Sequence, residues 1–588
     1  MNKEFLPISK SDLDKRGWGE PDIVIITGDA YVDHPSYGTA VIGRVLEDAG
    51  FKVGIIAQPD WRRIDDFVKL GKPRLFFGIT AGNLDSMVAN YTANRRPRKA
   101  DDFSPGGKIG LRPDRAAIVY TNRVKEAFPD TPIAVGGIEA SLRRFAHYDY
   151  WSDSVRRSIL ADSKADILVY GMGEAQILEI ARRLNKKETI EQIPGTVIMS
   201  KTISDLKGYI MLPSFEEASG DNAKFNHAIK TIFQEADPFR GKTLVQAHGD
   251  RFVVQFPPVP PLKENELDRI YLLNYARNWH PIYEAEGGVP GFETVRFSII
   301  SHRGCPGECT FCSLSLHQGR IVESRSEASI LEEIKRLSQE KLFKGTLTDI
   351  GGPTANLYKT SCKLWKGAGA CKNRPCLIPK KCEKLKLGYN EMLRLLAKAK
   401  QRPGVKHVFI GSGFRHDLLV EGYSDEFLKT LCASHISGQM KVAPEHCSRG
   451  VLTLMKKPLF ETYEKFVYRF KAVNKQLGKK QYLVNYFIVG HPGCTLKDAL
   501  ALSCYLIKHH LRPEQVQDFI PLPLTISGAM YYTETDPFTA RPLYVAKLDS
   551  QRKMQRALIQ YYQPKNKRLI AEALKKLGRM DLRRLFHV

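Results

Sequence analysis

The chain has 588 residues, 43% of them hydrophobic and 26% charged, and its formal net charge is +25. That length allows two or three domains with large cores. The first residues do not form a basic and apolar leader, and no apolar run is long enough to span a membrane, which argues against a secreted or membrane protein. We therefore expect a cytoplasmic protein whose 11 cysteines are reduced.

The first 200 residues predict an α/β domain. Five segments rich in β-branched and aromatic residues have the pattern of strands, and longer stretches separate them. Between the first two, residues 39–49 have the pattern of a helix that Gly50 would end. Five strands with crossovers of this kind predict a flavodoxin-like doubly wound sheet. The strand segments are 22–27, 51–57, 74–79, 132–137 and 165–170.

Residues 201–290 show weaker periodicity and include the run FPPVPP at 256–261. Pairs of prolines exclude regular structure and favour an extended, semi-rigid spacer. We predict that this segment is a connector between the first domain and the next.

The most informative feature of the chain is C-x3-C-x2-C, formed by Cys305, Cys309 and Cys312. Three thiolates at this spacing can bind three irons of a [4Fe-4S] cluster and leave the fourth iron open. The alternative is a structural zinc site completed by His302 or His317. Residues 294–301, just before the motif, have the pattern of a strand, and ligands at a strand end favour an active site.

From residue 291 to residue 562, strand patterns alternate with helix patterns. Residues 328–337, for example, repeat apolar side chains every three or four positions, as a helix does. Such alternation implies parallel strands with right-handed crossovers. Six units are too few for a closed eight-stranded barrel, so we predict a partial (β/α)6 barrel with ligands at the carboxyl ends of its strands. The predicted strands are 294–301, 346–350, 408–410, 441–446, 487–489 and 516–520.

A second group of four cysteines lies in residues 358–385, a stretch rich in Lys, Gly and Pro with little apolar content. We expect that this stretch cannot form a hydrophobic core and needs another staple, either zinc or a second iron-sulfur cluster. The spacing C-x8-C-x4-C-x5-C matches no motif, so zinc, iron-sulfur and free cysteines all stay open. The four are Cys362, Cys371, Cys376 and Cys382.

Residues 563–588 form a basic C-terminal tail, with eight basic side chains against two acidic ones. A basic surface favours a polyanionic partner, and a solvated basic helix is the alternative. The chain has no complete RRM, KH or helix-turn-helix signature. Two classes therefore compete: an iron-sulfur enzyme, or an RNA-binding protein whose cysteines form structural zinc sites.

With Phe311 just before its last cysteine, the motif resembles the signature of the radical S-adenosylmethionine superfamily. The strand ends DIGGPTAN, GSGFRHD, KVAPEH, NYFIVGHPG and VQDFIPLP closely resemble the YgiQ-type family of that superfamily, over almost the whole chain. The resemblance implies that a [4Fe-4S] cluster on the three cysteines binds S-adenosylmethionine and cleaves it to a 5′-deoxyadenosyl radical. It also implies an unidentified substrate and an electron donor such as flavodoxin or ferredoxin.

The same resemblance gives residues near the cofactor expected roles. Phe311 would contact the adenine, and the backbone of Gly351 and Gly352 would meet the methionine end, because glycine has no Cβ. Ser412 and Glu445 would line the rim of the site. The run SRGVLTLMKK at 448–457 resembles a stretch of methylthiotransferases, so tRNA modification competes with small-molecule chemistry.

The first domain resembles the cobalamin-binding modules that precede some radical-SAM cores. It departs from their D-x-H-x2-G motif, because Asp33 and His34 are adjacent and Gly38 lies four residues beyond the histidine. That departure makes coordination of cobalamin by His34 doubtful. The alternative is a domain that keeps the fold without the cofactor.

Overall fold

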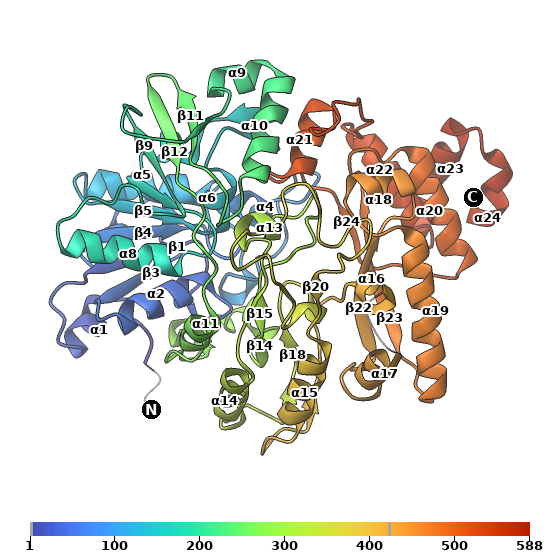
Figure 1. Ribbon diagram of the computed structural model, residues 1–588, viewed down its shortest axis with the longest axis horizontal. Coiled ribbons are helices and arrows are strands. Elements are labelled where there is room, and N and C mark those ends of the chain that lie inside the picture. The colour runs from blue at the N-terminus through green and yellow to red at the C-terminus, as the bar shows by residue number, and fades with distance from the viewer. Residues whose placement is uncertain (1–3, 422–424) are drawn as a thin grey trace. The chain divides into compact units, whose positions relative to one another are not determined.

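The computed structural model describes residues 4–421 and 425–588 and divides into two compact units (Figure 1). The first unit comprises Met1–Ser298, Leu316–Gly319 and Arg325–Glu333, and the second comprises Ile299–Ser315, Arg320–Ser324 and Ile334–Val588. Among the helices of the described residues, none has the length and apolar character that a membrane crossing requires.

Five parallel strands form the centre of the first unit, at the five places where the sequence predicts them. The strands run in the order β3-β1-β4-β5-β8, so β1 lies between the second and third strands of the unit, as in a flavodoxin-like sheet. Their bounds are β1 (Ile23–Thr27), β3 (Val53–Ala57), β4 (Phe76–Thr80), β5 (Ile133–Gly136) and β8 (Ile167–Val169).

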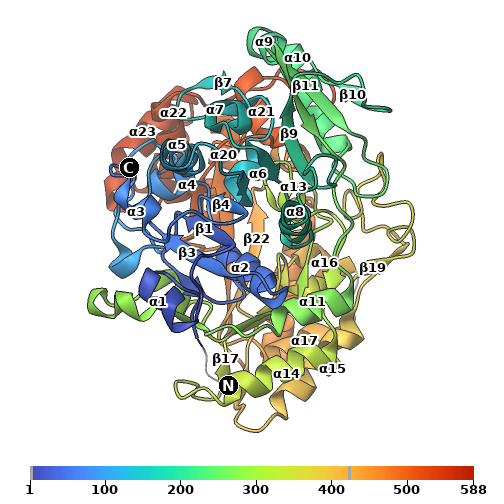
Figure 2. The ribbon, with the colours of Figure 1, turned by 90° about the vertical axis from the view of Figure 1, so that its left-hand side faces the viewer.

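Helices cover both faces of this sheet, which explains why its strands are apolar along their whole length. Helices α2 (Gly38–Asp48) and α8 (Glu174–Asn185) pack against each other on one face, while α5 (Ala116–Ala127) packs against β4 and α7 (Ile159–Ser163) (Figure 2). Helix α2 ends as predicted, because Gly50 adopts a φ of +90° just after it.

Residues 201–290 differ from the predicted connector, because they belong to the first unit and extend its sheet to nine strands. Their strands are short and their burial is uneven, so they carry little periodicity, yet Val245 and Val253 are completely buried. The proline run at 256–261 lacks regular structure, as expected. The strands that residues 201–290 add are β10 (Ile210–Met211), β11 (Leu244–His248) and β12 (Arg251–Gln255), and β9 (Thr196–Ser200), just before them, is the ninth strand. Their helices are α9 (Phe215–Gly220), α10 (Asn222–Gln234) and α11 (Glu264–Tyr271).

The second unit contains the partial barrel, with a strand at each of the six predicted places. Neighbouring strands pair in parallel where their registers are defined, and an isolated parallel bridge joins Phe414 to Val442. The first strand begins only at Ser298, so 294–297 lies outside it. The strands are β14 (Ser298–Ile300), β17 (Thr346–Leu347) with β18 (Asp349–Gly351), β21 (His407–Val408), β22 (Gln439–Glu445), β23 (Tyr482–Val489) and β24 (Val516–Asp518).

Helices separate these strands along the chain, as the alternating pattern predicts. Residues 328–337, for instance, fall within α14 (Glu327–Ser338). The others are α15 (Tyr389–Lys400), α16 (His416–Glu421), α17 (Asp425–Ser434), α19 (Phe460–Gln476) and α20 (Leu496–Lys508).

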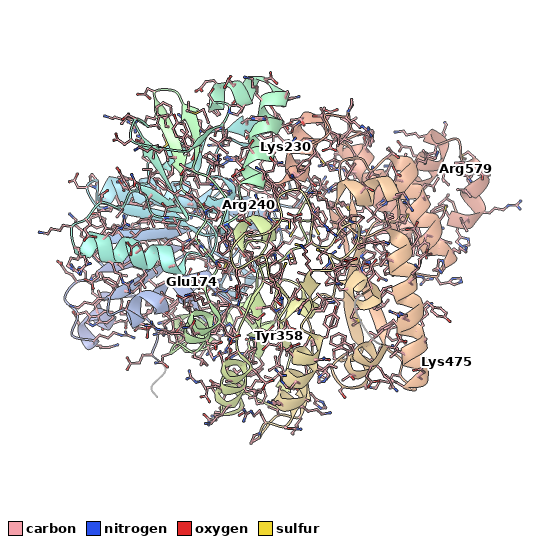
Figure 3. The ribbon with its side chains drawn as sticks, viewed as in Figure 1. Glu174, Lys230, Arg240, Tyr358, Lys475 and Arg579 are labelled. Carbon is pink, nitrogen blue, oxygen red and sulfur yellow. The ribbon has the colours of Figure 1, made fainter. Side chains whose placement is uncertain are left out.

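The C-terminal residues, predicted as a basic tail, are helical and pack against a core. Helices α22 (Asp549–Ile559), α23 (Lys567–Lys576) and α24 (Arg583–Phe586) form an apolar cluster with α20. Ile570 and Leu574 are completely buried, whereas the side chain of Arg579, labelled in Figure 3, is half exposed. The segment therefore has one face in a core and a basic face in solvent.

Candidate functional site

The three cysteines of the first motif lie on the loop that follows β15 (His302–Arg303) in the second unit. Gly304 opens the loop with a φ of +82°, and a Cβ there would lie 1.9 Å from the carbonyl oxygen of Ile321. Only glycine fits that position. The loop then turns back on itself, since the backbone N–H of Cys312 donates to the carbonyl of Cys309 at 3.0 Å.

The thiols of this loop are mutual neighbours. A Cβ at Gly307 would lie 3.3 Å from Cys305 Sγ and 3.7 Å from Cys309 Sγ, so both sulfurs flank this glycine. Burial raises the pKa of Cys312 to about 12, and the charges of Cys309 and Cys305 act in the same direction. The structure thus brings the three predicted ligands together.

Arg415 is the principal cation beside these thiols. Its Nη1 lies 2.8 Å from the position of a Cβ at Gly307. Burial raises the pKa of Cys305, and the guanidinium group of Arg415 opposes that shift. The side chain is buried and held in place by Asp417, and its backbone N–H donates to Asn356 Oδ1 at 3.0 Å.

A second cation, Lys457, faces the loop from beyond α18 (Arg449–Leu454). Its charge favours the thiolate of Cys312. Lys457 Nζ also lies 3.4 Å from Glu445 Oε1, and both side chains are nearly buried. Glu445 ends β22 at a bulge with a φ of +64°, and burial raises its pKa while Lys457 lowers it. Glu445, predicted on the rim, is therefore engaged in an ion pair beside the cysteine loop.

Thr310 clamps the loop to two other elements. Its N–H donates to the carbonyl of Met455 at 3.1 Å, and its hydroxyl donates to the carbonyl of Leu454 at 2.7 Å. The N–H of Ser527, in α21 (Ile526–Thr533), donates to the Thr310 carbonyl at 2.9 Å. Ser527 Oγ lies 2.7 Å from His491 Nε2. Two segments far apart in the sequence thus fix one residue between the cysteines, and His491 in turn contacts Ser527.

Gly351 and Gly352 lie where side chains have no room. A Cβ at Gly351 would lie 2.1 Å from Ser412 Oγ, and one at Gly352 would lie 2.6 Å from the ring of His302. Ser412 donates to the carboxylate of Asp349, which also accepts the Gly411 N–H at 3.0 Å. Ser412, predicted on the rim, therefore orients an acidic side chain against the glycine pair.

Phe311 is half-buried, and its ring lies nearly perpendicular to that of His491 with the centroids 6.2 Å apart. Its contact with adenine stays a prediction. The sequence reasoning did not single out Arg415, Lys457, Thr310 or Ser527. Arg415 stands within GSGFRHD and Lys457 within SRGVLTLMKK. The basic residue inside each of these two motifs was the sequence feature that could have indicated a cation near the cysteines. That second run thereby has a structural role, because its Leu454 and Met455 carbonyls accept hydrogen bonds from Thr310.

The second cysteine group lies on the insertion that begins at Tyr358, a buried side chain labelled in Figure 3. Contrary to our expectation, this stretch does contribute to a hydrophobic core, because Trp365, Leu377 and Leu385 are almost completely buried. Over residues 4–421 and 425–588, no three or more His, Cys, Asp or Glu side chains are grouped so that they could hold a metal ion. In a cubane, each thiolate binds a different iron, so such a cluster does not require ligands grouped around one ion.

Comparison with known proteins gives the family. Residues 5–298 match the model described as Radical SAM N-terminal, 299–502 match the Radical SAM superfamily, and 514–584 match a domain of unknown function, DUF3362. A UPF0313 protein of Clostridium botulinum (strain 657 / Type Ba4) is 53% identical over 99% of this chain and 91% of its own length. The chain belongs to the UPF0313 family of the radical SAM superfamily. A UPF0313 protein of Methanosarcina mazei is 51% identical over 98% of this chain and 97% of its own length.

Solved structures match this UPF0313 chain at low sequence identity. The apo form of OxsB, described as a cobalamin-dependent S-adenosylmethionine radical enzyme, matches with a TM-score of 0.51 and 10% identity over 95% of this chain and 71% of OxsB. The radical S-adenosylmethionine methyltransferase TsrM of Kitasatospora setae matches with a TM-score of 0.48 and 15% identity over 85% of this chain and 74% of TsrM.

The residues of the first unit do not fit a cobalamin at His34. The imidazole is completely buried, its ring packs edge-on against Phe292 at 5.6 Å, and its Nδ1 accepts the N–H of Ser36 at 3.1 Å. Burial lowers the pKa of His34, and the cations of Arg277 and Arg296 lower it further. A cobalt ligand needs an open face, which this ring lacks.

The carboxyl ends of β1 and β4, where a doubly wound sheet binds its ligand, are filled by the chain itself. Arg112 donates from Nε to the carbonyl of Gly28 at 3.0 Å and from Nη2 to Asp29 Oδ1 at 2.6 Å. Asp101 lies 3.3 Å from the same guanidinium, whose side chain is completely buried. The first unit therefore has a flavodoxin-like sheet whose carboxyl edge is filled by the chain's own residues.

Proposed function

We propose that this chain is a radical S-adenosylmethionine enzyme in which Cys305, Cys309 and Cys312 hold a [4Fe-4S] cluster. The observation that carries the proposal is that the sulfurs of Cys305 and Cys309 flank Gly307 with the buried cation of Arg415 beside them, while Cys312, on the same loop, lies close enough to feel both thiols' charges. Three thiolates on one short loop leave one iron of a cubane without a protein ligand, and S-adenosylmethionine would bind there.

The donor set suits such a cluster. A reduced [4Fe-4S] cluster supplies the electron that breaks the sulfonium carbon-sulfur bond of S-adenosylmethionine, giving methionine and a 5′-deoxyadenosyl radical. Arg415 and Lys457 offset the negative charge of the thiolates, whose burial would otherwise favour the protonated form. Thr310 holds the loop against α18 and α21, so that the three sulfurs keep their relative positions.

The remaining roles extend the same proposal. Phe311 would contact the adenine of S-adenosylmethionine, and the Gly351–Gly352 backbone would approach its methionine end. A protein with a net charge of +25 favours a polyanionic substrate. The electron would come from a soluble donor in the cytoplasm, such as flavodoxin or ferredoxin.

The test is anaerobic reconstitution with ferrous iron and sulfide, followed by addition of dithionite and S-adenosylmethionine. We expect broad visible absorption and release of 5′-deoxyadenosine. The variants Cys305→Ala, Cys309→Ala and Cys312→Ala should lose both, with unchanged far-ultraviolet circular dichroism. Cys432→Ala, which changes a buried cysteine far along the chain from the loop, is the matched control and should retain both. A colourless zinc protein that releases no 5′-deoxyadenosine would instead support the RNA-binding alternative.

A further inference from the structure

The second cysteine group has a defined backbone frame. β19 (Ser361–Cys362) pairs antiparallel with β20 (Leu385–Lys386), and this pairing closes the two ends of the insertion. Inside it, the N–H of Cys382 donates to the carbonyl of Cys376 at 2.8 Å. Lys381 Nζ lies 3.3 Å from the carbonyls of Cys382 and Leu385. The cysteines therefore occupy a closed loop and not an open surface strand.

The four thiols lie near one another and near the first cysteine loop. Burial raises the pKa of Cys376 to about 12, and the negative charge of Glu308 makes the second-largest contribution in the same direction. The charges of the other three thiols follow Glu308 as causes, so each of them lies close enough to Cys376 to affect it; Cys362 and Cys382 also pack with Cys376 against one apolar cluster, and the third thiol is Cys371. Glu308 belongs to the first loop, where it forms a buried ion pair with Arg320. The two cysteine groups are thus adjacent.

One apolar cluster anchors both groups. Trp365, Leu377 and Leu385 of the insertion pack with Ile321 and other buried side chains of the second unit. The cysteines that pack against this cluster come from the first loop and from the insertion; they are Cys305, Cys362, Cys376 and Cys382. Anything bound by the second group would therefore rest on the same core that supports the first loop.

The charge of the insertion suits a negatively charged centre. Residues 358–385 contain eight basic side chains and one acidic side chain. Four thiolates carry more negative charge than the positive charge of a zinc ion or of the iron-sulfide core of a cluster. Nearby cations therefore stabilise either centre. Four partly exposed thiols that are not paired as disulfides also retain their capacity to bind metal.

We propose that Cys362, Cys371, Cys376 and Cys382 bind a second iron-sulfur cluster beside the first cysteine loop. Structural zinc sites usually draw their four ligands in two close pairs of the C-x2-C to C-x4-C type, whereas here only Cys371 and Cys376 form such a pair and the other gaps are eight and five residues. In the part of the chain that the structure describes, no three His, Cys, Asp or Glu side chains are grouped around a single ion position, as a zinc site would require. In a cluster each of the four thiolates would bind a different iron.

The test is made in the chain that carries Cys305→Ala, Cys309→Ala and Cys312→Ala together. Its outcome does not depend on the proposed function, because the first site is removed. After anaerobic reconstitution with ferrous iron and sulfide, we expect about four irons and four sulfides per chain and broad visible absorption. Adding Cys376→Ser or Cys371→Ser should remove both metal and colour, whereas adding Cys504→Ser, a partly exposed cysteine outside both groups, should not.

Two results would overturn the proposal: one zinc per chain without sulfide, or no bound metal in this variant. If the triple variant does not fold, the wild-type chain gives the same answer. It should bind about eight irons, and Cys376→Ser alone should bind about four. Four irons in both proteins would show that the insertion holds no cluster.

Discussion

The guanidinium group of Arg415 donates to the carboxylate of Asp417 at 2.7 Å, and both side chains are buried beside the first cysteine loop. Asp417 stabilises the charge of Arg415 and, through Nε and Nη2, fixes its orientation. A cation fixed next to the thiolates favours the reduced state of a bound cluster, because that state carries more negative charge. The pair therefore connects the GSGFRHD strand end to the redox chemistry that we propose.

Replacing Arg415 with methionine should make the reduction potential of the first cluster more negative. The reason is loss of a buried positive charge next to Cys305 and Cys309. A redox titration followed by electron paramagnetic resonance measures the shift. Arg415→Lys keeps the charge without the planar fork and should shift the potential less. An unchanged potential in Arg415→Met would show that the side chain only supports packing.

Thr310→Val should loosen the cysteine loop, because the hydroxyl donates to the Leu454 carbonyl and lies 2.9 Å from Ser527 Oγ. We expect a loss of about 1 kcal/mol in the free energy of unfolding and less iron per chain after reconstitution. Thr310→Ser keeps the hydroxyl and is the matched control. Equal iron content and stability in the two variants would contradict the clamp.

The wild-type chain should not retain cobalamin after incubation with hydroxocobalamin and gel filtration, because Arg112 fills the carboxyl edge of the sheet. Stoichiometric cobalt in the eluted protein would refute this. Arg112→Met should also lower the free energy of unfolding by about 3–5 kcal/mol, since it leaves the carboxylates of Asp29 and Asp101 buried without their cation. The exposed variant Arg62→Met should cost little and serves as control.

Acid should destabilise the first unit through His147. Burial lowers the pKa of this imidazole from 6.5 to about 3. Below pH 6.5 the unfolded chain therefore takes up a proton that the folded chain does not, so stability is full above pH 6.5 and falls as the pH drops toward 3. The loss is up to about 1.4 kcal/mol per pH unit for one histidine.

Urea unfolding at pH 7, 6 and 5 measures that slope. The slope of the free energy of unfolding against pH gives the number of protons that the chain takes up when it unfolds. Between pH 6 and pH 5, His147→Gln should take up fewer protons than the wild type, by up to one. The control variant His227→Gln changes an exposed side chain and leaves the buried His147 in place, so it should keep the wild-type slope. Identical slopes in the wild type and His147→Gln would show that this histidine does not govern the acid response.

The local features of this protein follow from its sequence alone. Strand and helix patterns depend on side-chain periodicity along a few residues, so the five central parallel strands of the first sheet and all six places in the barrel could be predicted. The spacing of Cys305, Cys309 and Cys312 likewise defines their loop without any knowledge of what surrounds it.

Contacts between distant segments were decided only by the tertiary structure. Residues 201–290 join the first sheet, and the C-terminal helices form a core with α20, because burial depends on partners that local patterns do not name. In the same way, packing alone places Arg415 at Gly307, Arg112 at the end of β1, and the second cysteine group next to Glu308. The pairing of a buried charge is set by which chain segments meet, and one stretch of sequence does not contain that information.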